Sequence, residues 1–137
     1  MKYRTYHSLL SSLSPLFGLL SCPPHGGNDP GKIGIDDSLE KDLNLIIARK
    51  VQKILEQQDV EVVMTRESDK GLYEEQTSNK KVQDMKNRCA LINETQPDCV
   101  VSIHQNSYHE EYVHGAQVFY YGTSEEGKRL AETLQER

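Results

Sequence analysis

The chain has 137 residues, which is enough for one domain with its own core and too few for two. Hydrophobic residues make up 36% of the chain and charged residues 27%, a composition typical of a globular domain with a polar surface. The formal net charge is -5, and no cluster of Lys and Arg with interleaved aromatic residues is present. These features exclude a nucleic-acid-binding protein of the usual basic kind.

The first 22 residues form an apolar segment with two open interpretations. Lys2 and Arg4 precede an apolar run over residues 9–20, and the run leads to Cys22, as in a signal peptide with a lipoprotein-type cleavage site. Alternatively, the run is a degraded first strand of the fold or non-native sequence, since Ser and Pro interrupt it. A spanning helix needs roughly 20 unbroken apolar residues. Membrane association is therefore expected only if this segment is retained as an anchor.

Residues 23–137 are predicted to form the main domain, in which helices alternate with strands. A loop rich in Gly, Pro and Asp leads to a helix, for which Asp37 or Ser38 is the expected N-cap. The apolar positions of this helix recur every three or four residues and are Leu43, Ile46, Ile47, Val51, Ile54 and Leu55. The β-branched content of residues 60–65 predicts a short strand after it.

The second half of the chain continues the alternation. The polar residues 67–81 predict a surface loop, and a helix over 82–93 follows. Its expected apolar stripe is Val82, Met85, Cys89 and Ile92. Residues 98–103 are almost continuously apolar, which predicts a strand buried on both faces of a parallel sheet. A further strand over 116–121 and a helix from about Ser124 complete the pattern.

This order of elements predicts the α/β class, with a single domain whose mostly parallel sheet is flanked by helices. The domain is expected to be incomplete at its C-terminal end, because the chain stops at Arg137 inside the last helix. Cys89 and Cys99 are interpreted as small core residues. Arg66 and Arg88 are expected to pair with nearby carboxylates on the surface.

Three polar residues are predicted to meet at the carboxyl edge of the sheet, where ligands of such folds bind. His104 directly follows the strand over 98–103, His25 lies in the Gly-rich loop, and Glu40 lies in the first turn of the first helix. Two imidazoles and one carboxylate are the ligand set of a catalytic zinc site, which leaves one position for water. Taken singly, each has a simpler explanation, since Glu in a first helical turn usually complements the helix dipole.

Other polar residues are weaker candidates for the site. His109 and His114 lie five residues apart in a polar loop, a spacing that fits neither a helix face nor a strand face, so they are interpreted as substrate-rim or solvated residues. Asn106 is a candidate to orient the substrate or a metal-bound water. Asp29 is a candidate to hold the ligand loop through backbone N–H groups. Ordinary loop chemistry explains Asn106 and Asp29 equally well.

Four segments in register resemble the zinc-dependent N-acetylmuramoyl-L-alanine amidase family. They are His25-Gly26-Gly27-Asn28-Asp29-Pro30-Gly31, Glu40-Lys41-Asp42-Leu43-Asn44-Leu45, Met64-Thr65-Arg66, and Ser102-Ile103-His104-Gln105-Asn106-Ser107 followed by Gly115-Ala116. The similarity runs from about His25 to the chain end. Residues 65–70, 81–88 and 115–122 are most similar to the branch that acts on spore-cortex peptidoglycan.

The resemblance implies that His25, Glu40 and His104 bind Zn²⁺. It also implies hydrolysis of the amide between N-acetylmuramic acid and L-alanine in bacterial peptidoglycan, which is then the expected partner. The family's general base is a Glu on a later strand, expected here beyond Arg137, so no catalytic base is assigned within the chain. The signal-like segment and this substrate both favour an extracellular or cell-envelope location, the spore cortex included.

Two other functions stay open at this stage. One is a non-catalytic metal- or peptidoglycan-binding fragment that lacks the general base. The other is a different zinc peptidase, such as a carboxypeptidase on the same polymer. Four other glutamates cannot be assigned as the base by motif, and they are Glu110, Glu111, Glu125 and Glu126. They are interpreted more simply as parts of a solvated loop and of a helix start.

Overall fold

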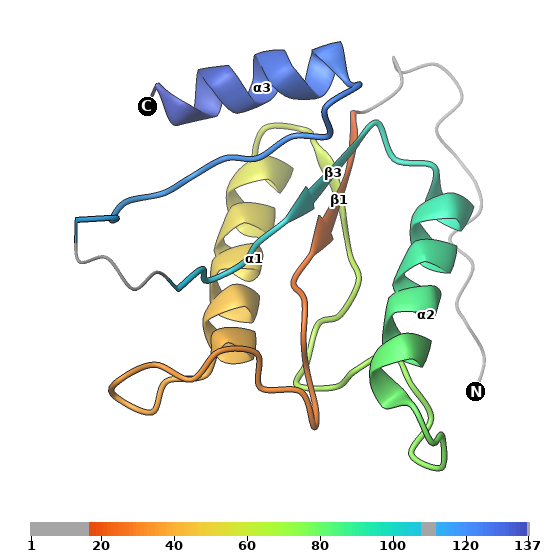
Figure 1. The fold of residues 1–137 in the computed structure, drawn as a ribbon. Helices are drawn as coiled ribbons and strands as arrows, with labels where there is room; N and C mark the ends of the chain where they lie inside the picture. Colours follow the sequence, from red (N-terminus) through yellow and green to blue (C-terminus); the bar gives the residue numbers. More distant parts are fainter. Residues whose placement is uncertain (1–16, 108–111, 137) are drawn as a thin grey trace. The chain divides into compact units, whose positions relative to one another are not determined.

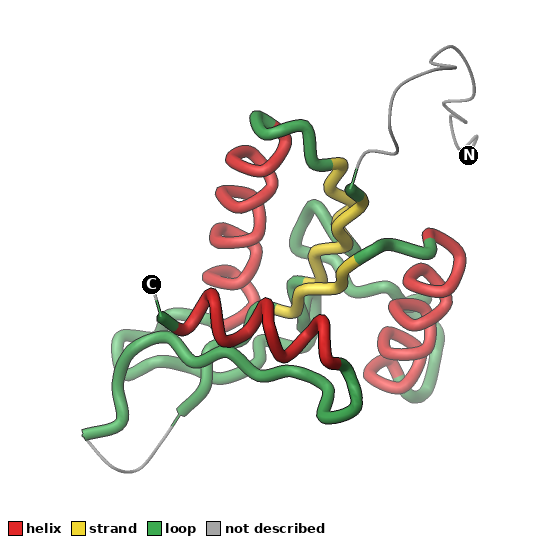
Figure 2. The backbone as a smooth tube through the Cα atoms, turned by 90° about the horizontal axis from the view of Figure 1, so that it is seen from above, coloured by secondary structure: helices red, strands yellow, loops and turns green. Residues whose placement is uncertain are grey.

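The computed structural model describes residues 17–107 and 112–136 (Figure 1). They form two compact units, the first ending at Asn106 and the second running from Ser107 to the chain end. The first unit holds a sheet of three parallel strands in the order β2-β1-β3. Helices α1 and α2 lie on opposite sides of this sheet (Figures 1 and 2). The predicted α/β class with a parallel sheet is confirmed.

The sheet is built around β1 (Gly18–Cys22), which pairs with β2 (Glu61–Met64) on one side and with β3 (Cys99–Ser102) on the other. In the register of the sheet, Leu20 lies opposite Val63 and Val100. Because all three strands run in the same direction, the segments that follow them leave from one edge of the sheet. This edge carries the candidate site.

The strand interpretation of the N-terminal apolar segment holds for residues 18–22, which form the centre of the sheet. Leu20 and Ser21 are almost fully buried, and Cys22 is a buried free thiol. Lys2, Arg4 and the run up to residue 16 lie outside the described residues, so the signal-peptide interpretation stays a prediction. Across 17–107 and 112–136, no helix has the length and apolar character needed to cross a bilayer.

Helix α1 (Glu40–Glu56) forms where the apolar periodicity predicts it, but its expected cap is wrong. The N-cap is Leu39, whose side chain offers no hydrogen bond. Neither Asp37 nor Ser38 is needed, because the first N–H of the helix donates to the carbonyl of Lys32 at 2.9 Å. The loop before α1 therefore folds back and caps the helix with its own backbone.

The core lies between α1 and the sheet. Its buried members are Leu19, Ala48, Val62 and Met64, and Leu45, Leu55, Val60, Val101 and Ile103 pack against them. Part of the predicted stripe of α1 stays outside this core, since Ile46 is 51% exposed and Ile54 is 61% exposed. Strands of four or five residues offer too little apolar surface to cover the whole stripe.

Helix α2 (Lys80–Thr95) begins with a side-chain cap from Asn79, which accepts from the N–H of Val82 at 3.1 Å. The predicted apolar stripe is not the buried face. Val82 and Met85 are about half exposed and Cys89 is exposed, whereas the buried residues of α2 are Asp84 and Arg88. The expectation fails because α2 turns a charged face inward, onto loop carbonyls that accept hydrogen bonds from Arg88.

Two expectations for strands are also wrong. Strand β3 alternates half-buried and exposed residues, and Val100 is 43% exposed, because β3 is an edge strand of the described sheet and only one of its faces is covered. Cys99 on this strand is half-buried. The segment 116–121 is extended but joins no ladder with other described residues.

The second unit contains α3 (Glu125–Gln135), which Ser124 caps by accepting from the N–H of Gly127 at 3.0 Å. The side chain of Gln135 accepts from the N–H of Val118 and donates to the carbonyl of Ala116, both at 3.0 Å. In the described residues, the backbone of this segment thus bonds to a side chain of α3 rather than to a neighbouring strand.

Candidate metal centre

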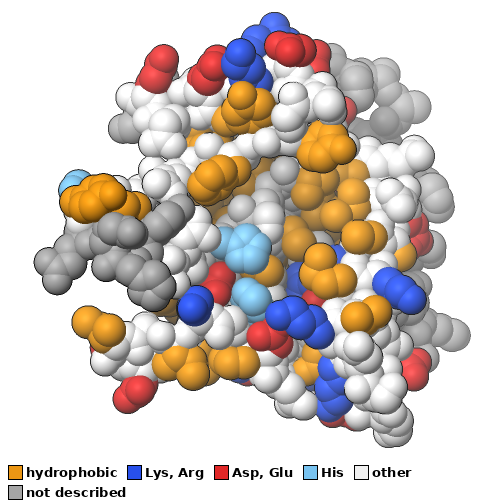
Figure 3. Space-filling view, viewed as in Figure 1, with side chains coloured by type: hydrophobic (Ala, Val, Ile, Leu, Met, Phe, Trp, Pro, Cys, Tyr) orange, Lys and Arg blue, Asp and Glu red, His pale blue; other side chains and the backbone are white. Residues whose placement is uncertain are grey.

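Three residues from separate segments converge at the carboxyl edge of the sheet. His25 follows the end of β1, His104 follows the end of β3, and Glu40 opens α1. Each offers one ligand atom, and these atoms all lie within 4.8 Å of one another. Figure 3 shows histidine side chains at the middle of this face, with acidic side chains beside them and basic side chains nearby. The structure thus brings together the three residues singled out from the sequence.

The donor atoms lie close enough together to share one metal ion. Nε2 of His25 lies 3.5 Å from Oε2 of Glu40, and Nδ1 of His104 lies 3.1 Å from Oε1 of Glu40. The two imidazole rings are nearly perpendicular, with centroids 5.7 Å apart. With zinc bonds of about 2.0–2.2 Å, ligand atoms at the corners of a tetrahedron lie roughly 3.3–3.6 Å apart. Two nitrogens and one oxygen also match the donor set of an open, catalytic zinc site.

The carboxylate of Glu40 is held in its charged form by the loops around it. Its side chain is 5% exposed, and burial alone would raise its pKa. Hydrogen bonds from the N–H groups of Lys32 at 2.8 Å and Gln105 at 3.0 Å outweigh burial, so the pKa of Glu40 lies below its ordinary value. Glu40 is therefore anionic at neutral pH.

A buried amide supports the same carboxylate from within α1. Asn44 is fully buried one turn after Glu40, and its Nδ2 donates to Oε1 of Glu40 at 3.4 Å. The Oδ1 atom of Asn44 accepts from Nε2 of Gln105 at 3.2 Å. Sequence reasoning missed Asn44, although its spacing of four residues from Glu40 on a helix was a usable signal.

The His25 ring is oriented by Asp29. Nδ1 of His25 lies 2.9 Å from Oδ2 of Asp29, and the other oxygen of Asp29 accepts from the N–H of Gly31 at 3.1 Å. The N–H bond agrees with the predicted role of Asp29 in holding the loop. Burial raises the pKa of Asp29, but the hydrogen bonds with His25 and Gly31 lower it by more. The pKa of Asp29 therefore lies below its ordinary value. Such a carboxylate fixes the ring and leaves Nε2 for a metal.

Arg66 and Arg88 are not surface residues, and we name this pair the arginine clamp. They are 5% and 2% exposed, respectively. Arg66 donates to the carbonyls of Pro23 at 3.1 Å and Pro24 at 3.2 Å. Arg88 donates to the carbonyls of Pro23 at 2.9 Å and His25 at 3.0 Å. The clamp thus holds the backbone of the segment that carries His25, which has a φ of 61°.

The two guanidinium groups differ in how their charge is balanced. Arg88 pairs with Asp84 at 2.6 Å, and although burial lowers the pKa of Arg88, this carboxylate raises it overall. Burial and the nearby charge of Arg88 lower the pKa of Arg66. The expected carboxylate partner is therefore correct for Arg88 and wrong for Arg66, whose acceptors among the described residues are backbone carbonyls. Buried charges of this kind persist only where acceptors are arranged around them.

The polar residues 67–81 support the loop that follows His25. Asp69 accepts from the N–H of Gly27 at 2.9 Å, and the hydroxyl of Tyr73 accepts from the N–H of Asn28 at 2.8 Å. Both bonds hold the loop between His25 and Gly31 from the outside. This support joins segments more than 40 residues apart, which local patterns do not reveal.

The remaining candidates are not members of the described metal-ligand cluster or stay untested. Asn106 is exposed, and its role toward the substrate stays a prediction. His114 is exposed in the second unit. His109, Glu110 and Glu111 lie outside the described residues. The acidic pair of the last helix occupies the first turn of α3, as the sequence predicts, and consists of Glu125 and Glu126.

Comparison with known proteins gives a consistent result. Residues 22–137 match the family Amidase_3, described as N-acetylmuramoyl-L-alanine amidase. The germination-specific N-acetylmuramoyl-L-alanine amidase of Bacillus subtilis (strain 168) is 40% identical over 117 residues, which are 83% of this chain and 49% of that protein. The AmiA amidase of Escherichia coli (strain K12) is 30% identical over 84% of this chain and 36% of its own length.

Solved structures of amidases share the fold. The CwlD amidase of Clostridioides difficile, determined in complex with the GerS lipoprotein, has a TM-score of 0.82 at 35% identity, over 87% of this chain and 63% of that one. An N-acetylmuramoyl-L-alanine amidase of Clostridium difficile 630 has a TM-score of 0.70 at 33% identity, over 90% and 62% of the two chains. The chain spans about half the length of the Bacillus relative. This chain belongs to the N-acetylmuramoyl-L-alanine amidase family.

Proposed function

We propose that this chain carries the zinc centre of an N-acetylmuramoyl-L-alanine amidase, which hydrolyses the amide between N-acetylmuramic acid and L-alanine in bacterial peptidoglycan. The convergence of His25, Glu40 and His104 is the observation that supports this proposal most strongly. The similarity to a germination-specific amidase supports the spore-cortex branch. The cell envelope, the spore cortex included, is the proposed place of action.

The residues of the centre divide the work between binding and orientation. His25, Glu40 and His104 would hold the ion, Asp29 and the arginine clamp would fix His25, and Asn44 would fix Glu40. A zinc ion supplies Lewis acidity toward the scissile carbonyl and the attacking water. One anionic ligand and two neutral imidazoles would balance only part of the charge of the zinc ion, so its Lewis acidity would be retained for hydrolysis.

The proton acceptor of the reaction is not among the carboxylates described at this centre. Glu40 is a proposed ligand, and Asp29 is engaged with His25 and Gly31. Neither is free to take a proton from water and pass it to the leaving amine.

Digestion of purified muropeptides by the zinc-loaded chain tests the proposal. Intact stem peptide, identified by mass, is the expected product, and its release should be slow because neither Glu40 nor Asp29 can act as the proton acceptor. Loss of a terminal amino acid instead would indicate a carboxypeptidase, and retention on peptidoglycan without release would indicate a binding fragment. His104→Ala should abolish release, whereas Asp36→Ala, at an exposed position that bonds to Ser38 within its own turn, serves as the control.

A further inference from the structure

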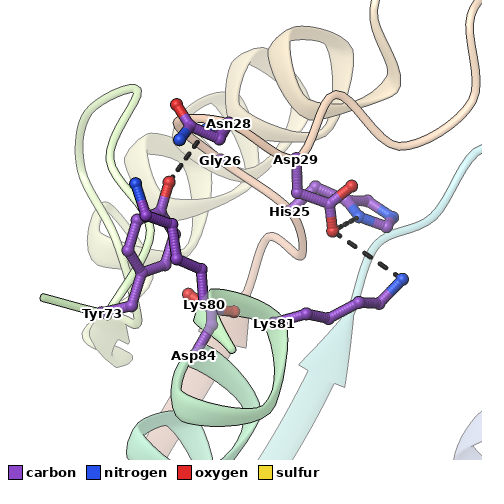
Figure 4. A pocket seen from close by; sticks show the side chains of 8 residues that line it. All are labelled: His25, Gly26, Asn28, Asp29, Tyr73, Lys80, Lys81 and Asp84. Atoms are coloured by element: carbon purple, nitrogen blue, oxygen red, sulfur yellow. Dashed lines mark hydrogen bonds and ion pairs between the residues drawn. The ribbon is translucent and has the colours of Figure 1, made fainter. Parts of the chain in front are cut away.

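A pocket of about 240 Å³ lies beside the proposed ligand His25 (Figure 4). The ligand loop, the loop around residue 73 and the first turn of α2 form its walls. The residues that matter below are His25, Asp29, Tyr73, Lys80, Lys81 and Asp84. Asp29 lies between the His25 ring and the end of the Lys81 side chain (Figure 4). The pocket therefore adjoins the metal centre across a single carboxylate.

The two acidic residues of the pocket differ in their partners. Asp84 forms an ion pair with Arg88 and also accepts from the N–H of Leu72, so its charge is balanced. Asp29 bonds to the His25 ring and to the N–H of Gly31 and keeps its negative charge. Both carboxylates therefore have partners other than an incoming peptide.

The two lysines of the pocket differ in their partners. Lys80 forms an ion pair with Glu75 at 2.7 Å, and its Nζ lies 5.3 Å from the centroid of the Tyr73 ring. Lys81 is 76% exposed, and the acid that the structure places nearest to it is Asp29 at 4.0 Å, the outer limit of an ion pair. Among the described lining residues, Lys81 is thus the cation with the weakest compensation.

The backbone adds to this positive potential. Lys80 and Lys81 occupy the first turn of α2, and this turn holds no acidic residue. Helices favour acidic side chains in their first turn, because the N-terminal end of the helix dipole is positive. Lysines in the first turn reduce the stability of helix α2. Locally unfavourable residues of this kind are expected at functional sites.

We propose that Lys81 binds a carboxylate in the peptide part of the substrate, which makes this pocket a subsite for an acidic stem peptide. The inference rests on the proposed amidase function. The α-carboxylate of the residue after L-alanine lies about 6–7 Å along an extended chain from the scissile amide. Lys81 is separated from the metal ligand by one carboxylate side chain, so it lies within reach of that group.

The pocket also suits the rest of a short peptide. The ring of Tyr73 offers an apolar wall, and its hydroxyl is fixed by the N–H of Asn28. A fixed wall opposite a mobile, exposed amine allows the peptide to dock while its carboxylate meets Lys81. Selection between acidic and amidated stem peptides would then depend on one side chain.

The test compares two ligands that differ in one group, N-acetylmuramoyl-L-alanyl-D-isoglutamate and its amide, N-acetylmuramoyl-L-alanyl-D-isoglutamine. NMR titration of the full, zinc-loaded chain measures the affinity for each and also reveals any cleavage. The acid is expected to bind roughly fivefold more tightly than the amide, as for one exposed ion pair. Lys81→Ala should remove this preference, and Lys81→Arg should retain it. Lys86→Ala, on an exposed part of the same helix, should leave it unchanged.

Three results would overturn the subsite. One is equal affinity of the unmutated chain for the two ligands, and another is a preference that survives Lys81→Ala. In both cases the ligands bind. These results would reject the role of Lys81 and would leave the proposed amidase substrate intact. The third is the absence of binding by either ligand to a chain shown to hold zinc, which would reject the proposed substrate together with the subsite.

Discussion

The Nδ1 atom of His25 lies 2.9 Å from a carboxylate oxygen of Asp29, four residues further along the same loop. This contact fixes which ring nitrogen of His25 faces the other two proposed ligands. The same carboxylate accepts from the N–H of Gly31, so ring orientation and loop conformation depend on one side chain. Carboxylates in this position tune both the geometry and the basicity of a histidine ligand.

Removal of this carboxylate should weaken metal binding without unfolding the domain. For Asp29→Ala we expect zinc affinity to fall by about 10- to 100-fold. Competition with a chromophoric chelator measures it. The matched control is Asp36→Ala, because Asp36 is exposed and bonds only within its own turn, to Ser38. Equal zinc affinity in the two variants would contradict the role of Asp29.

Acidification should destabilise the zinc-free protein through Glu40. The pKa of Glu40 lies below its ordinary value of 4.5, so its carboxylate stabilises the fold above about pH 4.5, and this contribution is lost as the pH falls toward the lowered pKa. Urea unfolding between pH 3 and 6 should show a smaller loss of stability for Glu40→Gln than for the unmutated chain. Identical pH dependence would rule out this linkage.

Disruption of the arginine clamp should be costly because both members are buried. Arg88→Ala leaves Asp84 without its partner and removes the donor to the carbonyl of His25, so we expect a loss of about 3–5 kcal/mol in the free energy of unfolding. Urea denaturation measures the loss. Arg49→Ala is the control, since exposed Arg49 donates only to the carbonyl of Glu67 and should cost less than about 1 kcal/mol. Similar costs for both variants would contradict the clamp.

A methyl group at Gly31 should disturb the metal centre directly. A Cβ there would lie 2.7 Å from Oε2 of Glu40 and 2.8 Å from Cδ2 of His25, and Gly31 has a φ of +68°. Gly115 also has a positive φ, +89°, but a Cβ there meets nothing within 4 Å. Both alanine substitutions should lower the free energy of unfolding by about 1–2 kcal/mol through backbone strain. Only Gly31→Ala should also lower zinc affinity, and equal affinities would show that crowding is unimportant.

Strong local patterns predicted most of the fold and the proposed ligands. The three- and four-residue periodicity fixed α1, and β-branched runs fixed β2 and β3. His104 could be placed at the sheet edge because it follows a strand directly. Glu40 could be placed there because it opens a helix after a Gly-rich loop. These inferences need only neighbouring residues and the direction of a parallel strand.

The clearest failure concerns contacts between distant segments. The inward face of α2 could not be predicted, because Asp84 and Arg88 face loop carbonyls some 60 residues away rather than apolar neighbours. The cap of α1 was misjudged for a different reason, since the nearby backbone carbonyl of Lys32 replaced the expected side chain. Local periodicity shows which residues are apolar. It does not show where a folded loop presents carbonyl oxygens that need a hydrogen-bond donor.

Zinc content after exhaustive dialysis tests the central claim most directly. We predict one zinc ion per unmutated chain and per His114→Ala chain, and none above buffer for His25→Ala or His104→Ala, each shown to be folded by circular dichroism. A folded, unmutated chain that retains no zinc, or His25→Ala and His104→Ala variants that retain it fully, would contradict a metal centre formed by His25, Glu40 and His104.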